Sequence, residues 1–271
     1  MLSEPTAQDL AQRHYREALA AGWEIPPGAR ILEIACGQGD MSAVLAEAVG
    51  ATGHVTGIDI ASPEYGAPLT LGEATALLQA GPLGHRLTFR FQTDLLDAKV
   101  SFPDDAFDAV VLAHGAWYFA DLEQLRATLR RVGQWAPVLH FAEWDLKPQT
   151  LAQIPHLVAV LLQGVIEGYH PNSAANVRTP FARQQIHALL AETGWDVTHE
   201  FRADTSELRD GEWEVDLALH DALPTVASLP APAAIRDQLR NQGDLLRSLA
   251  SHPEQRSLPA YALTAVRFRD I

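Results

Sequence analysis

The sequence of 271 residues predicts an α/β protein built on a doubly wound, mostly parallel sheet. Two stretches predict this class. Residues 30–49 read as a short apolar strand, a tight turn through two glycines and then a helix, which is the unit from which such sheets are built. Residues 107–113, Phe-Asp-Ala-Val-Val-Leu-Ala, form a nearly all-apolar run that is typical of a central parallel strand covered on both faces.

The other elements alternate between strand and helix along the chain, as this class requires. An apolar run or apolar alternation indicates each strand, and an apolar stripe with a period of 3.6 residues indicates each helix. Thr70 with Glu73 forms a capping box, and Asp121 caps the helix that follows it. Strands are expected at 54–60, 87–92, 137–144, 195–201 and 261–268, and helices at 7–21, 71–80, 151–169, 179–194 and 233–249.

Composition and charge exclude several classes of protein. The formal net charge of -14 disfavours a nucleic-acid partner, because binding to a phosphate backbone needs a basic surface. The single cysteine, Cys36, excludes an intramolecular disulfide, and the eleven histidines show no spacing that recommends a metal site. We find no signal peptide and no run approaching the ~18 apolar residues that a membrane span needs. A cytoplasmic protein without a membrane partner is therefore expected.

The glycine turn after the first strand is the candidate ligand site. Gly37 and Gly39 let backbone N–H groups approach a ligand beside a helix N-terminus. Ser42 stands where the third glycine of a dinucleotide fingerprint belongs, so the turn alone does not specify the ligand. Glu33 is placed at the end of the strand, where a carboxylate can meet a cation. Asp59 ends the next apolar run, where an acid can accept both hydroxyl protons of a ribose.

These residues carry a resemblance to a known family. Glu33, Gly37, Gly39 and Asp59 together resemble the S-adenosylmethionine site of class I methyltransferases, whose first motif reads acid-x-Gly-x-Gly-x-Gly. Ala35 replaces the first glycine of that motif in this chain. Because a side chain removes the freedom of φ that glycine has, we expect an ordinary backbone with negative φ at Ala35.

The resemblance implies the fold and the cofactor site. It implies a Rossmann-like sheet of about seven strands whose last pair, 195–201 and 261–268, is antiparallel, with S-adenosylmethionine as cofactor. Asp94 is implied to accept a hydrogen bond from the adenine amino group, while the next apolar residue, Leu95, packs on the ring. The cofactor-binding residues are then Glu33, Ala35, Cys36, Gly37, Gly39, Asp59, Ile60, Asp94, Leu95 and His114.

Reactive side chains follow the buried strand 107–113, and ligands in such sheets lie beyond the carboxyl ends of strands. His114 is the first candidate for a base near pH 7, if the methyl acceptor is a hydroxyl or an amine. Tyr118 and Glu143 are the second choices for a catalytic role. Glu143 can equally be a carboxylate bonded to neighbouring backbone, and Tyr15 of the leading helix can equally line the pocket or pack on the core.

The chain is interpreted as a single domain over residues 1–271 with two insertions, at about 147–178 and 205–258. Both insertions depart near the fifth and the final strands, on the side of the sheet where acceptors dock in the family that the chain resembles. We therefore predict that they form a helical cap that supplies the acceptor pocket. The competing hypothesis is that one insertion, through an apolar helix such as 151–168, builds a homodimer interface.

The resemblance implies an S-adenosylmethionine-dependent methyltransferase that acts on a small-molecule acceptor. An enzyme that binds this cofactor without methylating, or a non-catalytic binding protein, fits the same motifs, because a fold and a cofactor site do not fix the acceptor chemistry. An NAD-dependent oxidoreductase is favoured less. It would need no Glu33 and would usually show the third glycine, which Ser42 replaces.

Overall fold

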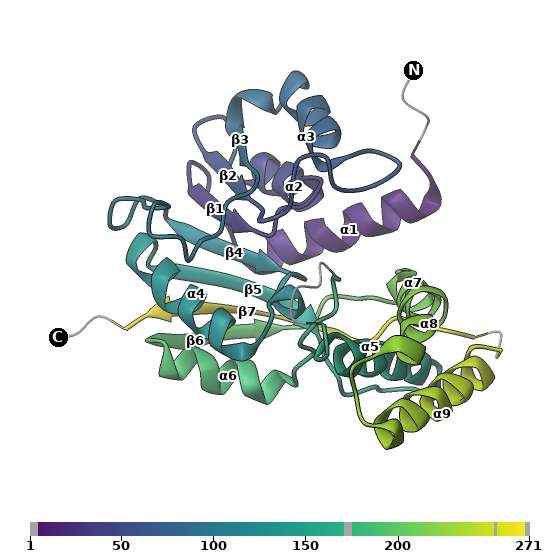
Figure 1. Ribbon diagram of the computed structural model, residues 1–271. Coiled ribbons are helices and arrows are strands. Elements are labelled where there is room, and N and C mark those ends of the chain that lie inside the picture. Colours follow the sequence, from purple (N-terminus) through teal and green to yellow (C-terminus); the bar gives the residue numbers. More distant parts are fainter. Residues whose placement is uncertain (1–4, 171–174, 252–253, 269–271) are drawn as a thin grey trace.

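The computed structural model of this chain describes residues 5–170, 175–251 and 254–268, which form one seven-stranded sheet with flanking helices (Figure 1). The strand order is β3-β2-β1-β4-β5-β7-β6. β1 to β5 are parallel, and β7 runs antiparallel to both β5 and β6, which confirms the predicted fold class. The strands are β1 (Arg30–Ile34), β2 (His54–Ile58), β3 (Leu87–Arg90), β4 (Ala109–Ala113), β5 (Val138–Trp144), β6 (Trp195–Phe201) and β7 (Ala260–Arg267).

Helices cover both faces of the sheet, as a doubly wound fold requires (Figure 1). α1, α2 and α3 group together beside the first strands, and α4 lies next to α6 beside the later ones. The main helices are α1 (Ala7–Gly22), α2 (Asp40–Ala48), α3 (Leu71–Ala80), α4 (Leu122–Trp135), α5 (Ile154–Glu167), α6 (Arg183–Glu192), α7 (Asp210–Leu217), α8 (Leu223–Thr225) and α9 (Ala233–Ala250).

Two of the predicted helix starts are confirmed in atomic detail. The hydroxyl of Thr70 accepts from the N–H of Glu73, whose carboxylate accepts in turn from the N–H of Thr70. Asp121 likewise accepts from the third residue of α4. The predicted start at Thr179 is wrong, because the Thr179 hydroxyl donates to the Ala120 carbonyl and α6 begins only at Arg183.

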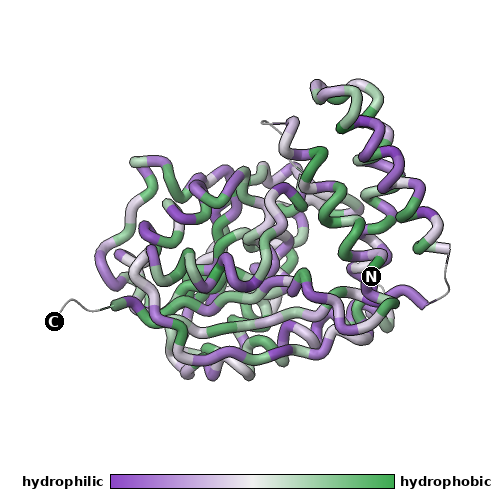
Figure 2. The backbone as a smooth tube through the Cα atoms, turned by 90° about the horizontal axis from the view of Figure 1, so that it is seen from below, coloured by the Kyte–Doolittle hydropathy of each residue, from purple (hydrophilic) through white to green (hydrophobic). Residues whose placement is uncertain are grey.

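The core is formed by the inner strands and the helix faces turned towards them. Ile31, Leu32, Val110, Val111 and Leu112, on the central strands β1 and β4, are completely buried. Figure 2 shows hydrophobic residues gathered in the interior of the molecule, while the outer helices carry both hydrophobic and hydrophilic residues. Strands buried on both faces need such continuous apolar runs, which is why residues 107–113 predict a central strand correctly.

The two insertions contribute helices that pack on one another. α5 comes from the first insertion and α7 to α9 from the second, and their apolar faces form a second core separate from the main one. Figure 1 shows this helical unit beside the sheet, near the ends of β4 and β5. Residues 171–174 and 252–253 of the insertions lie outside the described residues. The function of the unit as a cap stays a prediction. None of the described helices is long and apolar enough to cross a membrane.

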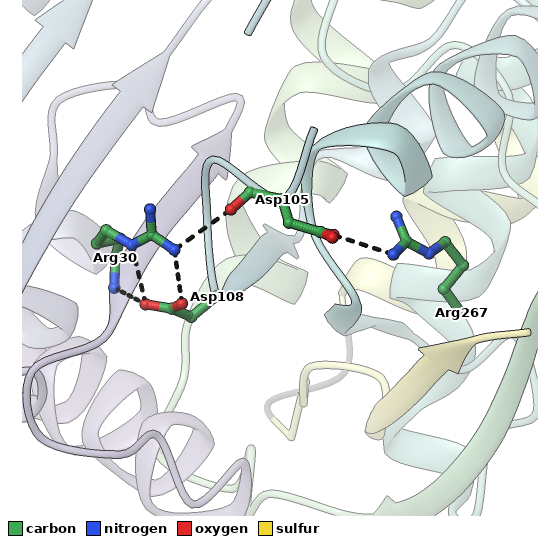
Figure 3. Close-up of polar contacts among 4 residues, drawn as sticks. All are labelled: Arg30, Asp105, Asp108 and Arg267. Atoms are coloured by element: carbon green, nitrogen blue, oxygen red, sulfur yellow. Dashed lines mark hydrogen bonds and ion pairs between the residues drawn. The ribbon is translucent and has the colours of Figure 1, made fainter. Parts of the chain in front are cut away.

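Two ion pairs lie at the end of the sheet where β1 begins, opposite the carboxyl ends of the parallel strands (Figure 3). Arg30 donates through its guanidinium and its backbone N–H to Asp108, with both closest contacts at 2.8 Å. Arg267 pairs with Asp105 at 2.9 Å. The Arg30 and Asp108 side chains are about half exposed, so this pair stabilises the fold by no more than ~1 kcal/mol. Its main effect is to align the starts of β1 and β4.

Candidate active site

The turn between β1 and α2 has three residues in the left-handed region. Ala35, Gly37 and Gly39 have φ of 57°, 52° and 86°. The expected negative φ at Ala35 is therefore wrong. The three left-handed residues turn the chain from β1 into α2. The strand and the helix that the turn joins impose this geometry, and the side chain of Ala35 does not prevent it. An alanine in this region costs ~1–2 kcal/mol, which the surrounding packing must offset.

Gly37 leaves room for a ligand beside the turn. No atom lies within 4 Å of the place where a Cβ on Gly37 would stand, so this residue faces open space. Gly39 is the N-cap of α2 and provides no side-chain hydrogen bond to the first N–H groups of the helix. These N–H groups and the positive end of the helix dipole favour a polar or anionic group at this place.

Asp59 follows β2 and faces the same turn. Its Oδ2 accepts from the N–H of Gly37 at 2.9 Å, and its Oδ1 accepts from the N–H of Ala61 at 2.8 Å. The two backbone donors fix the plane of the carboxylate. Because each carboxylate oxygen has two lone pairs, each keeps one for a further donor such as a ribose hydroxyl.

A pocket extends from Asp59 along the carboxyl ends of β1, β2 and β4. Ile60 is 63% exposed on one side of it, and Leu95 is buried on another. Asp94 is exposed and uses Oδ1 to accept from the N–H of Leu96, which leaves Oδ2 for a ligand. The pocket is lined by Ile34, Ala35, Ile58, Asp59, Ile60, Thr93, Asp94, Leu95, Gly115, Tyr118, Phe119, Gln124, Thr128 and Arg178.

Glu33 and Cys36 lie behind the turn rather than in the pocket. β1 continues past Glu33 to Ile34, and the carboxyl group, 3% exposed, accepts a short hydrogen bond from the Ser42 hydroxyl. Burial raises the pKa of Glu33 to about 8, although Ser42 and the charge of Arg16 act against the shift. The carboxyl group thus meets the Ser42 hydroxyl, and its expected contact with a cation stays a prediction. Burial also raises the pKa of the Cys36 thiol, which agrees with a role through its backbone alone.

His114 stands at the carboxyl end of β4 and contacts two other polar side chains. Its φ is 53°, and its Nε2 lies 2.6 Å from the Tyr15 hydroxyl. Its Nδ1 lies 3.3 Å from Oε1 of Glu143, an ion-pair contact without well-aligned hydrogen-bond geometry. Glu143 is 1% exposed and accepts from the N–H groups of Ala116 and Trp144. Glu143 therefore bonds to neighbouring backbone, as one hypothesis has it, and also faces His114, so a catalytic role stays open.

Aromatic rings surround His114. The Trp144 ring centroid is 4.6 Å from that of His114, and the Tyr15 and Trp144 rings stack with an interplanar angle of 5°. Tyr118 lines the nearby pocket and is 42% exposed, but the dense protein around its hydroxyl raises its pKa, with the charge of Glu143 adding to the shift. The structure therefore brings His114, Tyr118 and Glu143 to one edge of the sheet.

Some neighbours of this site have no signal in the sequence. Gln12 of α1 donates to Asp210 of α7 at 2.6 Å, a contact between residues 198 positions apart. Gly115 allows the chain after β4 to approach the glycine turn, and its place directly after His114 could have indicated this role. Among the described residues, no group of three or more histidine, cysteine or carboxylate side chains is arranged to hold a metal ion.

Comparisons with known proteins show the family. Residues 31–136 match the family model described as a methyltransferase domain. The crystal structure of a cyclopropane-fatty-acyl-phospholipid synthase-like protein from Lactobacillus casei is 39% identical, with a TM-score of 0.86, over 98% of this chain and 96% of that one. Demethylmenaquinone methyltransferase from Thermus thermophilus is 33% identical over 182 residues, or 63% of this chain and 76% of that protein. The chain belongs to the class I S-adenosylmethionine-dependent methyltransferases.

A longer relative extends the match beyond the family model. Methyltransferase phomM' from Diaporthe leptostromiformis is 30% identical over 237 residues, which are 73% of this chain and 61% of that protein. This chain thus spans about three fifths of that relative. The family model ends at residue 136 and so includes Asp59, Asp94 and His114 but not Glu143.

S-adenosylmethionine is the cofactor of this methyltransferase family, and the residues of this chain fit it. The space beside Gly37 and the unused acceptors of Asp59 suit the polar part of a nucleoside. Ile60 and Leu95 provide apolar contacts for its base, and Asp94 has a free acceptor beside them. Of the site residues implied by the resemblance, Ala35, Asp59, Ile60, Asp94 and Leu95 line the pocket, and the part of all ten residues in cofactor binding stays a prediction.

Proposed function

We propose that this protein is a methyltransferase that transfers the methyl group of S-adenosylmethionine to a hydroxyl or amine of a small molecule. The observation that supports the proposal most strongly is that two groups of residues lie at the same end of the sheet, where the parallel strands have their carboxyl ends. The glycine turn and Asp59 lie at the carboxyl ends of β1 and β2, and the Tyr15–His114–Glu143 group lies at the ends of β4 and β5.

In this proposal the first site holds the cofactor. Asp59 accepts the ribose hydroxyl protons with its free lone pairs, and the adenine lies between Ile60 and Leu95 with its amino group on Asp94. Ala35, Gly37 and Gly39 contribute through the backbone of the turn. The bound sulfonium supplies an activated methyl group, so the protein mainly has to position the reactants and exclude water.

His114 acts as the base for the acceptor, assisted by Glu143. Its side chain is 21% exposed and is next in the chain to Gly115, which lines the pocket, whereas Glu143 is buried and would stabilise an imidazolium. Tyr118, exposed in the pocket, is placed to contact the acceptor. The Trp144 ring beside His114 gives the acceptor an apolar wall.

The helical unit formed by α5 and α7 to α9 is proposed to cover the acceptor. Gln12 joins α1 to Asp210 of this unit, which brings the unit to the same edge as His114. The formal charge of -14 supports a small-molecule acceptor rather than a nucleic acid. We also propose a cytoplasmic protein, in keeping with its single, buried cysteine. α5 exposes Leu161 and Val165, which are available for a homodimer contact.

The test is transfer of a labelled methyl group. Purified protein is incubated with methyl-labelled S-adenosylmethionine and a cell extract, and the extract is then separated into small molecules, protein and RNA. The proposal expects label in the small-molecule fraction, reduced strongly by His114→Asn. Label in protein or RNA would contradict the acceptor class. Cofactor binding without any transfer would favour a non-methylating enzyme or a binding protein.

A further inference from the structure

We propose that Tyr15 is a catalytic residue whose hydroxyl passes the proton of the methyl acceptor to His114. This inference rests on the proposed function and extends it, because neither composition nor motif assigns a chemical role to the N-terminal helix. Tyr15 lies on the buried side of α1 with only 6% of its surface exposed, and its hydroxyl reaches across to the end of β4.

Nε2 of His114 has a hydrogen-bond partner, and Nδ1 faces a buried carboxylate. Nε2 lies 2.6 Å from the Tyr15 hydroxyl, and Nδ1 lies 3.3 Å from the Glu143 carboxylate. An acceptor molecule therefore cannot reach a lone pair on His114 directly unless Tyr15 first moves away. The Tyr15 hydroxyl, by contrast, uses its own hydrogen towards His114 and keeps lone pairs that can accept another proton.

The charge of Glu143 sets the direction of this hydrogen bond. Glu143 accepts from two backbone N–H groups, those of Ala116 and Trp144, so each of its carboxylate oxygens acts as an acceptor. A carboxylate facing Nδ1 favours the tautomer with the proton on Nδ1, which leaves Nε2 as an acceptor. Tyr15 then has to be the donor. Burial and the charge of Glu143 raise the pKa of Tyr15, so its hydroxyl is neutral and carries the proton that it must donate.

The transfer balances in one step. The bond between the acceptor atom and its hydrogen breaks, and its electron pair stays on the acceptor atom, which forms the new bond to the methyl group. The bond between that methyl group and the sulfonium sulfur would break at the same time, with its electron pair left on the sulfur, so that neutral S-adenosylhomocysteine would be the leaving group. The proton moves to the Tyr15 oxygen while the original Tyr15 proton moves to Nε2 of His114. Tyr15 ends unchanged, and His114 ends as an imidazolium beside Glu143.

The surrounding structure keeps this chain of groups in place. The Tyr15 ring stacks on Trp144 at a centroid distance of 6.5 Å, and the centroid of the His114 ring lies 5.5 Å from that of Tyr15 and 4.6 Å from that of Trp144. The bond between Gln12 and Asp210 ties α1 to the helical unit proposed to cover the acceptor. Tyr15 thus stands where α1, the sheet edge and this unit meet.

The first test compares Tyr15→Phe, His114→Asn and the native protein in the labelled-methyl assay. Tyr261→Phe is the matched control, since it removes a buried tyrosine hydroxyl that has no partner among the described residues. The relay expects Tyr15→Phe to lose about 100-fold or more in transfer rate, with affinity for S-adenosylhomocysteine within about 2-fold of native. If Tyr15→Phe keeps or gains activity while His114→Asn loses it, His114 acts directly. The relay is then wrong and the proposed function stands.

The second test needs no acceptor. Nitrogen-15 NMR of histidine-labelled native protein reports the tautomer of each ring, and the His114 signals are those missing from His114→Asn. The relay expects a proton on Nδ1 and none on Nε2 of neutral His114, with the Nε2 shift changed by Tyr15→Phe and not by Tyr261→Phe. A proton on Nε2 in the neutral ring would overturn the relay, whether or not methyl transfer is found.

Discussion

The approach of Gly115 to the glycine turn can be tested with a double-mutant cycle. A Cβ added at Gly115 would lie 2.7 Å from the Cβ of Ala35 and 3.3 Å from Cδ1 of Leu112. Gly115 has a φ of -120°, which alanine adopts without strain. The cost of Gly115→Ala is therefore overlap rather than backbone strain, and overpacking of this kind costs ~1–3 kcal/mol.

The partner change, Ala35→Gly, removes the atom that causes the overlap. It relieves a left-handed alanine, worth ~1–2 kcal/mol, and loses ~0.5–1 kcal/mol through the freer unfolded chain. We therefore expect Ala35→Gly alone to stabilise the protein by up to ~1.5 kcal/mol. In the Ala35→Gly background the nearest contact of a new Cβ at Gly115 is Leu112, whose flexible end can shift. The expected coupling between the two changes is ~1–2 kcal/mol.

The measurement is urea unfolding of the four proteins in the cycle. The slope of the unfolding free energy against urea concentration, the m-value, should be the same in all four. The free energy of unfolding should fall clearly for Gly115→Ala and recover when Ala35→Gly is added. Effects that simply add, within ~0.5 kcal/mol, would contradict the direct contact between Ala35 and Gly115. Destabilisation by Ala35→Gly alone would contradict the left-handed backbone at that residue.

Three further predictions concern buried titratable groups. Folding raises the pKa of Glu33 from 4.5 to about 8, so the folded protein retains a proton that the unfolded chain releases. Stability should fall as pH rises through that interval, and Glu33→Gln should flatten this slope in urea unfolding at several pH values. Burial lowers the pKa of His156 from 6.5 to about 3, which has the opposite sign. The free energy of unfolding should fall as pH drops below 6.5, and His156→Gln should weaken that loss. An equal loss below pH 6.5 in native protein and His156→Gln would show that His156 does not cause it. Cys36 is buried and its thiol pKa is raised, so iodoacetamide should modify it only in urea, as mass spectrometry can show.

Local signals in the sequence were enough to predict most of the fold. The apolar run before the glycine turn, the capping box of Thr70 and Glu73 and the all-apolar run 107–113 each depend on neighbours within a few residues. Strand order followed from these elements only through the resemblance to a family. α6 starts later than predicted, because Thr179 bonds the Ala120 carbonyl 59 positions away.

The parts of the site that the sequence did not predict depend on contacts between distant segments. The left-handed Ala35 results from a turn fitted between β1, α2 and the loop at Gly115. The pKa of Glu33 depends on how deeply β1 is buried, which no residue near it in the sequence determines. Tyr15 and His114 are 99 positions apart, so the apolar stripe of the first helix could place Tyr15 on a buried face but could not name its partner.

The position of the cofactor on the turn after β1 is the central claim. The proposals for His114 as the base, for the place of the acceptor and for proton transfer through Tyr15 all depend on it. Calorimetry with S-adenosylhomocysteine on native protein and Asp59→Ala measures it most directly, with Asp108→Ala as a control carboxylate at the opposite edge of the sheet. We predict that Asp59→Ala weakens binding by ~1–3 kcal/mol, because buried hydroxyls lose their acceptor, and that Asp108→Ala leaves it unchanged. Equal affinity in native protein and a folded Asp59→Ala variant would show that the nucleoside does not lie on this turn.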